Sequence, residues 1–566
     1  MKTLAFGIDE NIGTLIDRAA EAFPKASVNM HVRSAVFPSE NVEVDFPTIA
    51  RLGGEAAGWL AKAGIERGSV VGIVKRNHCD TALLAASAAR IGAIPALLSP
   101  ILSPEETKSL IKRLNPAYVI ADDVGLRNCG DLLRRSRSIR TIAIERCPSY
   151  GIGLDALRNA CPAPRNVAAP EAPMVITHTS GTTGVPKLVV HSARTISVRA
   201  RAHAIKVPGI AVRRNDRLAA GIMWVHARAI DGFAAILHLG LSALALCDLS
   251  IAGVSDALES FQPTIVEALP GAFALWEPLA KDKPEIFGTT RLFVNSFDAV
   301  HPRLVRTFLD AAGTRFPLWA QAYGQSEAGG MTAALYTRRT FASKRPRKPN
   351  ARSVGRVIPG VGKVRITDRE TGVPLKRGRF GQFEFRSEGL ALTYLRQEDL
   401  HLKRRRGDWW TTGDVGILTR LGKVKLFDRD VDWIPKLGSC LAIEDRLLDE
   451  MPDLAEVVII RLGGRAIPVV CTQDGEPLDA DRWARATAGL VLEAPVQMAW
   501  DEIPRTSTYK VRRQILAGVL ESRELEDKER RASRPRSVGR RRATGTSRHR
   551  KPASSRSTRA LSSLAK

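Results

Sequence analysis

The first part of the chain alternates between two spacings of apolar residues. Asn11–Phe23 has apolar positions at helical spacing, which predicts an amphipathic helix. Ser69–Val74 and Ala93–Leu98 are short apolar runs typical of buried strands, and Asp80–Ile91 between them has the spacing of a helix. Strand, helix and strand in this order predict a parallel sheet with right-handed crossovers. We therefore expect an α/β fold, with a large N-terminal domain built of parallel-rich α/β subdomains.

The pattern changes in the second half of the chain. Short strand-like runs separated by Gly and Pro fill Val354–Phe385, which predicts a β-rich subdomain. Charged residues gather at Asp428–Trp433 without apolar periodicity, as at a hinge into a small α+β domain. The expected parts are an N-terminal domain of residues 1–428, a C-terminal domain of residues 429–522 and a tail of residues 523–566.

Composition adds one further feature, a basic tail. The 566 residues are 44% hydrophobic and 25% charged, as in soluble globular enzymes, but the formal charge is +26. Residues 528–566 hold 14 Lys or Arg against one acid, which is half of that excess, and we expect them to be disordered. Arg536–Arg550 offers contacts to nucleic-acid phosphates. No aromatic residue is interleaved there, so a charged, solubilising tail is the preferred interpretation.

Cysteine usage and hydropathy indicate a cytoplasmic protein without a membrane span. The seven cysteines are scattered and form no Cys-x-x-Cys pair, which is typical of a reducing compartment and gives no sign of a structural metal. The first twenty residues lack a continuous apolar stretch, which argues against a secretory signal. Leu218–Leu249 is interrupted by charged and His residues and fits a buried strand and helix better than a bilayer span.

One loop has the composition of a polyphosphate site. Thr177–Lys187 combines hydroxyls, glycines and one cation directly after the apolar run Met174–Ile176. Glycines let several backbone N–H groups point one way, and Lys187 brings a positive charge. No Gly-x-x-x-x-Gly-Lys frame fits it, so it is not a Walker loop. On composition alone a flexible surface turn is an equally good interpretation.

Four separated stretches together resemble one family. They are residues 179–187, residues 323–327, residues 412–414 with 428–429, and residues 504–506 with 510. Their types and order are similar to those of the adenylate-forming (AMP-binding) superfamily of acyl-CoA synthetases and adenylation domains, over roughly residues 11–520. The resemblance implies that the C-terminal domain is mobile.

The resemblance also implies a two-step reaction. A carboxylate attacks the α-phosphate of ATP to give an acyl adenylate and pyrophosphate, and a thiol then displaces AMP. The expected function is therefore an acid:CoA ligase that uses ATP, Mg²⁺ and CoA. The alternatives are an enzyme that loads the phosphopantetheine of an acyl carrier protein and a non-catalytic family member that binds nucleotide.

The resemblance assigns nucleotide-binding roles to three segments. The loop over the β- and γ-phosphates comprises Thr179, Ser180, Gly181, Thr182, Thr183, Gly184 and Lys187. The adenine turn includes Asp298 and Ala299, and Tyr323 of the segment Tyr323, Gly324, Gln325 and Ser326 resembles the aromatic residue that packs on adenine. Ser326 stands where Thr is usual and keeps the hydroxyl. A core aromatic residue is the alternative for Tyr323.

Four single residues receive catalytic or ligand roles in the same way. Glu327 resembles the carboxylate that holds Mg²⁺, a cation that prefers oxygen ligands. Asp414 resembles the acceptor of both ribose hydroxyls, and Arg429 the cation that contacts the nucleotide. Lys510 resembles the C-terminal lysine between the substrate carboxylate and the α-phosphate. The alternatives are a solvated acid for Glu327, a turn residue for Asp414, a surface ion pair for Arg429 and one cation of a basic face for Lys510.

The acyl pocket is expected around residues 221–233. His226 stands where many acyl- and aryl-activating members carry His or an aromatic residue, and Trp224 is its neighbour. A core histidine is the alternative. No Phe-Asp pair is available to anchor an α-amino group, and Asp231 could do so only from another place, which disfavours an amino-acid substrate.

Four departures from the family pattern concern this site. Leu188 replaces a Gly after the Pro-Lys pair, and Ser296–Ala299 replaces the common Gly-Gly-Ala turn. Val431 stands where an Asp often serves as a hinge, and Tyr509 replaces the Gly before Lys510. The last two lie in the moving part, so they bear on thioester formation more than on adenylation.

Overall fold

The structure is a computed structural model that describes residue 7 and residues 10–179, 186–342, 352–473, 475–506 and 510–532, without the side chains of residues 342 and 526–532. Residues Met1–Gly518 form one unit and Val519–Lys566 a second. No helix among these residues is both long and apolar enough to cross a bilayer.

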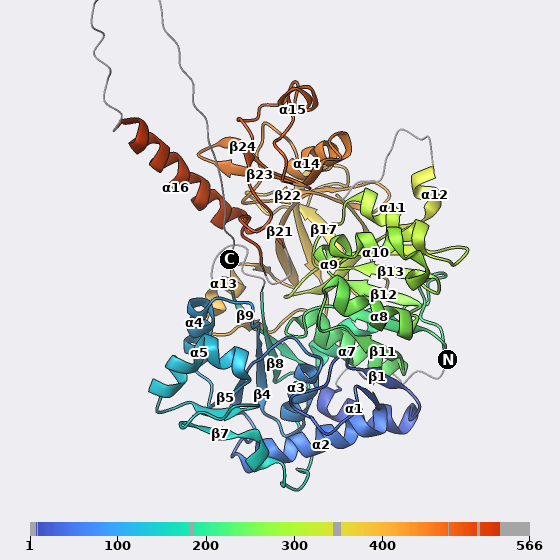
Figure 1. Cartoon of the computed structure of the whole chain (residues 1–566), viewed down its shortest axis with the longest axis vertical. Helices are drawn as coiled ribbons and strands as arrows, with labels where there is room; N and C mark the ends of the chain where they lie inside the picture. The colour runs from blue at the N-terminus through green and yellow to red at the C-terminus, as the bar shows by residue number, and fades with distance from the viewer. Residues whose placement is uncertain are drawn as a thin grey trace, which may run out of the picture. The chain divides into compact units, whose positions relative to one another are not determined.

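An eight-stranded sheet holds most of the N-terminal elements (Figure 1). Its order is β19-β9-β8-β4-β3-β5-β6-β7, and β4, β3, β5, β6 and β7 pair in parallel. The strands are β3 Val70–Val74, β4 Ile94–Leu98, β5 Tyr118–Ala121, β6 Arg140–Ala143, β7 Gly151–Gly153, β8 Pro173–His178, β9 Leu188–Ser192 and β19 Thr393–Tyr394.

Helices cover both faces of this sheet. They are α1 Ile12–Ala22, α2 Phe46–Lys62, α3 Asp80–Arg90, α4 Pro104–Leu114 and α5 Asp123–Arg135. Ile73 shares a core with α1, α2 and α3, whereas its neighbour Val74 faces the core of α4 and α5, because successive strand residues point to opposite faces. Ser103 and Glu106 form a capping box that fixes the start of α4.

A fourteen-stranded sheet contains the rest of the large domain. Its parallel part is β11-β10-β12-β13-β14, and β1 joins β11 in parallel. The strands are β1 Ser27–Asn29, β2 Glu43–Asp45, β10 Arg217–Gly221, β11 Ser242–Ala245, β12 Ile265–Ala268, β13 Leu292–Asn295 and β14 Leu318–Gln325. The helices of this part are α6 Ala193–Ala200, α7 Ala227–Leu239, α8 Ile251–Phe261, α9 Pro270–Leu275, α10 Glu277–Asp282, α11 Pro302–Ala311 and α12 Arg338–Ala342.

The other part of the same sheet is antiparallel. Beyond β14 the order is β15-β16-β22-β21-β18-β17, with β20 paired to β21. The elements are β15 Gly329–Tyr336, β16 Ser353–Val357, β17 Lys363–Thr367, β18 Phe380–Arg386, α13 Glu398–Leu402, β20 Arg405–Arg406, β21 Trp409–Leu418 and β22 Val424–Arg429. The change from parallel to antiparallel pairing at β14 brings the ends of β13, β14, β21 and β22 near one another.

The C-terminal elements have their own sheet and core. They are α14 Cys440–Glu450, β23 Leu454–Leu462, β24 Arg465–Thr472, α15 Ala480–Ala486, β25 Val496–Gln497 and α16 Arg513–Ala532, and the sheet order is β23-β24-β25. Leu447, Val457 and Trp483 lie in this core.

The predicted fold class is confirmed: parallel-rich α/β parts, a β-rich part over 353–386 and a small α/β part after β22. Helix α16 continues through residues 523–532, the first part of the predicted tail. Glu, Lys, Arg and Ala are strong helix formers, which explains the extension. Residues 533–566 lie outside the described part, and the domain limits and the mobility of the C-terminal domain stay predictions.

Candidate active site

Asp414 is the centre of a hydrogen-bonded group where β14 and β21 meet. Its Oδ2 accepts from the Tyr323 hydroxyl at 2.5 Å and from Gln325 Nε2 at 3.0 Å. Its Oδ1 is 3.7 Å from Nε of Arg429, which stands opposite Asp414 in the β21–β22 pairing. Asp414 is buried, so these partners hold its carboxylate in one orientation. The Tyr323 hydroxyl is thus committed to Asp414, while its ring lines the cavity.

The predicted adenine turn directly follows β13. Asn295 Nδ2 donates to the Asp298 carbonyl at 2.8 Å, and the Ala299 N–H donates to Asp298 Oδ1 at 2.9 Å. Phe297 has φ +78°, a left-handed conformation that costs a bulky residue roughly 1–3 kcal/mol. The family's glycine at this turn is thus replaced by a strained phenylalanine.

The two ends of the predicted phosphate loop are closed by backbone hydrogen bonds. The Thr179 N–H donates to the Lys187 carbonyl at 3.0 Å, and the Lys187 N–H donates to Thr179 Oγ1 at 3.0 Å. Burial lowers the pKa of Lys187, and nearby Glu327 opposes that shift. Its Nζ lies 5.4 Å from the centre of the Tyr394 ring. Ser180, Gly181, Thr182, Thr183 and Gly184 lie outside the described residues.

Glu327 is a buried carboxylate that lines a cavity together with Thr179 and Lys187. Its Oε1 accepts a short hydrogen bond from the Tyr394 hydroxyl. Burial, together with this carboxylate, raises the pKa of Tyr394, so Tyr394 stays a donor. Among the described residues no cluster of three His, Cys, Asp or Glu could hold a metal by itself. One carboxylate beside the predicted phosphate loop fits Mg²⁺, which takes few protein ligands and completes its shell with water and phosphate oxygens.

Lys510 reaches the cavity from the segment before α16. The Thr506 N–H donates to the Lys510 carbonyl at 2.8 Å. Burial lowers the pKa of Lys510, Asp298 and Asp414 act to raise it, and Arg429 acts to lower it. The structure therefore brings Lys510, Asp414, Tyr323 and Asp298 to one cavity of about 820 Å³. Tyr509 lies outside the described residues.

A second cavity of about 410 Å³ shares Tyr323, Arg429 and Lys510 with the first. His226 lies on it, with its ring 5.4 Å from that of His178 and 5.5 Å from that of Phe297. Burial lowers the pKa of His226 to about 3, so its imidazole is neutral at neutral pH. His226 thus supplies a neutral wall near Lys510, which also acts to lower its pKa.

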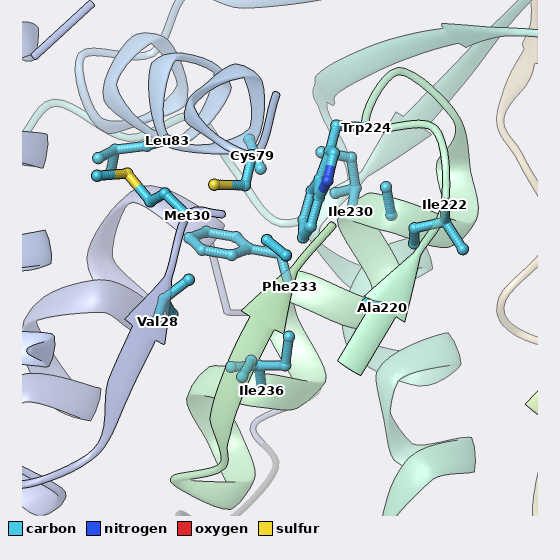
Figure 2. Packing of buried hydrophobic residues seen from close by; sticks show 14 of the residues in the cluster. Val28, Met30, Cys79, Leu83, Ala220, Ile222, Trp224, Ile230, Phe233 and Ile236 are labelled. Atoms are coloured by element: carbon cyan, nitrogen blue, oxygen red, sulfur yellow. The ribbon is translucent and has the colours of Figure 1, made fainter. Parts of the chain in front are cut away.

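Trp224 belongs to the hydrophobic core as well as to the wall of this cavity. Figure 2 shows its indole among apolar side chains from several elements, including Phe233 of α7 and Cys79, the residue before α3. It is 2% exposed. Its role in a substrate pocket stays a prediction.

The charged side chains that line the second cavity include four more, three of them without a predicted role. They are Arg199, Arg228, Asp231 and Glu267. Glu267 forms a short ion pair with Arg228, and Asp231 Oδ2 lies 4.0 Å from Arg199 Nη1. The signal in the sequence was Arg228 and Asp231, three residues apart in an apolar helix and therefore on one face. Arg199 and Glu267 come from other elements and gave no such signal.

Two departures from the family pattern have structural accounts. Leu188 is the fully buried first residue of β9 and packs in the core with α4 and α5. Val431 is 52% exposed after β22. A glycine at position 188 would leave the backbone more flexible, whereas Leu188 stabilises the fold by burying an apolar side chain.

Known proteins resemble this chain over most of its length. The 3-amino-2-hydroxy-4-methoxybenzoate diazotase of Streptomyces cremeus is 34% identical over 538 residues, which is 90% of this chain and 95% of the relative. The 3-aminoavenalumate diazotase of a Streptomyces species is 24% identical over 446 residues, 74% of each chain. The structure of an anthranilate CoA ligase in complex with anthranoyl-AMP superposes with a TM-score of 0.77 at 19% identity, over 92% of this chain and 99% of that chain.

The family described as AMP-binding enzyme matches residues 21–395, about two thirds of the chain. This range contains the predicted phosphate loop, the predicted adenine turn and Glu327. The chain therefore belongs to the AMP-binding enzyme family.

Proposed function

We propose that this protein is an ATP-dependent diazotase, which converts the amino group of an aromatic amine to a diazonium group by activating nitrite. The observation that carries the proposal is the 34% identity to the Streptomyces cremeus diazotase over nearly the whole of both chains. Activation of an oxyanion by adenylation suits the family to which the chain belongs, and nitrite is a small planar oxyanion like a carboxylate.

The first step joins nitrite to AMP. A nitrite oxygen attacks the α-phosphorus of ATP, the bond to the β-phosphate oxygen breaks, and pyrophosphate leaves. The product is a mixed anhydride of nitrous acid and AMP. Two anions must approach each other in this step, so the residues that position and neutralise them carry most of the catalysis. In the proposed arrangement Lys510 neutralises the developing charge, Asp414 holds the ribose, and Lys187 with Thr179 binds the departing phosphates.

The second step transfers the nitrosyl group. The amine nitrogen attacks the nitrosyl nitrogen, an N–N bond forms, the N–O bond to AMP breaks, and AMP leaves. The two amine protons then leave with the nitrosyl oxygen as water. The overall reaction is amine, nitrite and ATP to diazonium ion, AMP, pyrophosphate and water, and it needs no external oxidant or reductant.

Mg²⁺ and the domain arrangement are part of the proposal. Glu327 would hold Mg²⁺, which would neutralise phosphate charge. Tyr394 donates to Glu327 and keeps that carboxylate in place. The proposed C-terminal domain, residues 429–522, contributes Lys510.

The second candidate is the acid:thiol ligase expected from the sequence, with CoA or a carrier-protein phosphopantetheine as acceptor. The neutral His226 beside Lys510 favours it, because an uncharged wall leaves Lys510 free to neutralise a substrate carboxylate. Both candidates share adenylation and differ in the oxyanion activated and in the acceptor.

The deciding experiment is incubation at pH 7.5 with ATP, Mg²⁺, nitrite and a panel of aminobenzoates, followed by an azo-coupling reagent. We expect coloured product only with ATP, together with AMP. A parallel reaction replaces nitrite and the coupling reagent with CoA. Formation of a CoA thioester without diazonium would establish the second candidate and reject the first.

A further inference from the structure

Three charged side chains that line the second cavity each have one buried polar atom without a hydrogen-bond partner among the described residues. These atoms are Arg228 Nη1, Arg199 Nη2 and Asp231 Oδ1. Arg199 and Asp231 are more than nine-tenths buried, and the Arg228 side chain is 20% exposed. An unpartnered buried polar atom is costly, and native structures keep few of them. All three residues line the same cavity, so one ligand could satisfy them together.

Contacts with other residues hold both guanidinium groups in place. Glu267 forms an ion pair with Arg228 through Nη2, which leaves Nη1 free. Arg199 donates from Nε to the Gly389 carbonyl at 2.7 Å and from Nη1 to the Ser326 carbonyl at 3.1 Å, which leaves Nη2 free. Each guanidinium group is therefore held in place by the protein and keeps one nitrogen without a hydrogen-bond partner.

Two glycines make room for these arginines. A Cβ at Gly232 would lie 2.7 Å from Arg228 Nη1, and a Cβ at Gly329 would lie 2.7 Å from Arg199 Cδ. Both distances are shorter than atoms tolerate, so neither guanidinium could keep its place beside an alanine. The two glycines thus leave room for two cations in the wall of this cavity.

The charge of the cavity favours an anion. Its lining holds six Lys or Arg residues against four Asp or Glu residues, and burial raises the pKa of one of these acids, Asp231, to about 6. Burial lowers the pKa of His203 and His226, so both stay neutral at neutral pH. The lining therefore has an excess of positive charge whether Asp231 is ionised or neutral.

We propose that Arg228 and Arg199 form a subsite for the carboxylate of an aromatic amino acid, in which the amino group and not the carboxylate is the reacting group. Glu267 and Gly232 position Arg228. This inference deepens the proposed function and rests on it for the identity of the reacting group. A planar guanidinium matches a carboxylate, which sets the ligand class.

The test is direct binding by calorimetry, without turnover. The probes are 3-aminobenzoate and 3-aminobenzamide, which differ in charge but hardly in shape, and sodium nitrite. We expect wild-type protein to prefer the benzoate by about 10- to 100-fold, and Arg228→Gln to abolish that preference while leaving the benzamide affinity unchanged. Arg365→Gln is the matched control, because Arg365 pairs with buried Glu384 away from both cavities.

A second variant keeps the proposal testable if Arg228→Gln fails to fold. Gly232→Ala retains every charge but displaces the guanidinium, and we expect it to lower benzoate affinity selectively. The inference is overturned if wild type shows no preference for the carboxylate, or if both probes lose affinity equally. It is also overturned if only nitrite binding depends on Arg228. Binding is measured without activation of nitrite. A failure of the carboxylate subsite can therefore be told apart from a failure of the proposed diazotase activity.

Discussion

The phenol hydroxyl of Tyr323 donates a hydrogen bond of 2.5 Å to Oδ2 of Asp414, the carboxylate predicted to accept the ribose hydroxyls. Tyr323 thus orients the proposed ribose ligand in addition to lining the cavity. Tyr323→Phe keeps the ring and removes this bond. We expect ATP affinity to fall about tenfold, as measured by equilibrium binding. Tyr336→Phe is the control, because the Tyr336 hydroxyl donates to the Ser353 carbonyl and Tyr336 lines neither cavity; it should leave ATP affinity unchanged. Equal losses of ATP affinity in both variants would show that Tyr323 has no specific role in binding ATP.

Lys510→Ala should separate binding from chemistry. Lys510 is the proposed cation at the reacting phosphate, and its pKa is lowered by burial in the cavity. We expect nitrite-dependent pyrophosphate exchange to fall at least about 100-fold, with ATP binding retained. Lys436→Ala removes an exposed lysine of the same region and serves as the control. Normal exchange in Lys510→Ala would reject the assignment.

Glu327→Gln tests the proposed metal ligand. The amide oxygen can still accept from Tyr394, so the local structure should persist while the negative charge is lost. We expect the Mg²⁺ concentration needed for half-maximal exchange to rise about tenfold or more, because a carboxylate is the stronger ligand. Glu398→Gln changes an exposed acid and should have no effect. An unchanged Mg²⁺ requirement in Glu327→Gln would place the metal elsewhere.

The stability of the protein should depend on the titration of Asp231. Burial raises the pKa of Asp231 to about 6 against the opposing effect of Arg199 and Arg228, whereas the unfolded chain has the ordinary value of 3.8. The folded state binds the extra proton between these values, so this stabilisation is fully present below about 3.8 and is lost as pH rises through about 6.

Asp231→Asn removes that titration. Between pH 4.5 and 7.5 the free energy of unfolding of wild type should fall by about 2 kcal/mol relative to the variant, measured by urea denaturation. Asp256→Asn, at an exposed position of α8, should keep the wild-type pH dependence. Parallel pH profiles for wild type and Asp231→Asn would contradict the assigned pKa.

The sequence best predicted those helices and strands in which the spacing of apolar residues is uninterrupted. The predicted helix Asp80–Ile91 and the predicted strand Ala93–Leu98 agree with the structure to within one residue at each end, because uninterrupted apolar patterns define them. The residues with predicted nucleotide roles were found through motifs of neighbouring residues, such as 323–327 and 412–414, and the structure joins these two motifs by hydrogen bonds to Asp414.

What the sequence did not reveal depends on residues far apart in the chain. Arg228 and Glu267 are 39 positions apart, and Glu327 and Tyr394 are 67 apart, so no local pattern links them. The positive φ of Phe297 was also unpredicted, since a bulky aromatic residue normally avoids it. These contacts depend on how separate elements meet, which periodicity does not encode.

Arg199 links the proposed carboxylate subsite to the proposed metal ligand. It donates to the carbonyl of Ser326, the residue directly before Glu327; it also lines the second cavity, and its Nη2 has no hydrogen-bond partner among the described residues. A ligand on that nitrogen therefore acts on the support of the residue proposed to hold the metal. We expect the aromatic acid and Mg–ATP to bind cooperatively, and by thermodynamic linkage each should tighten the other by the same factor.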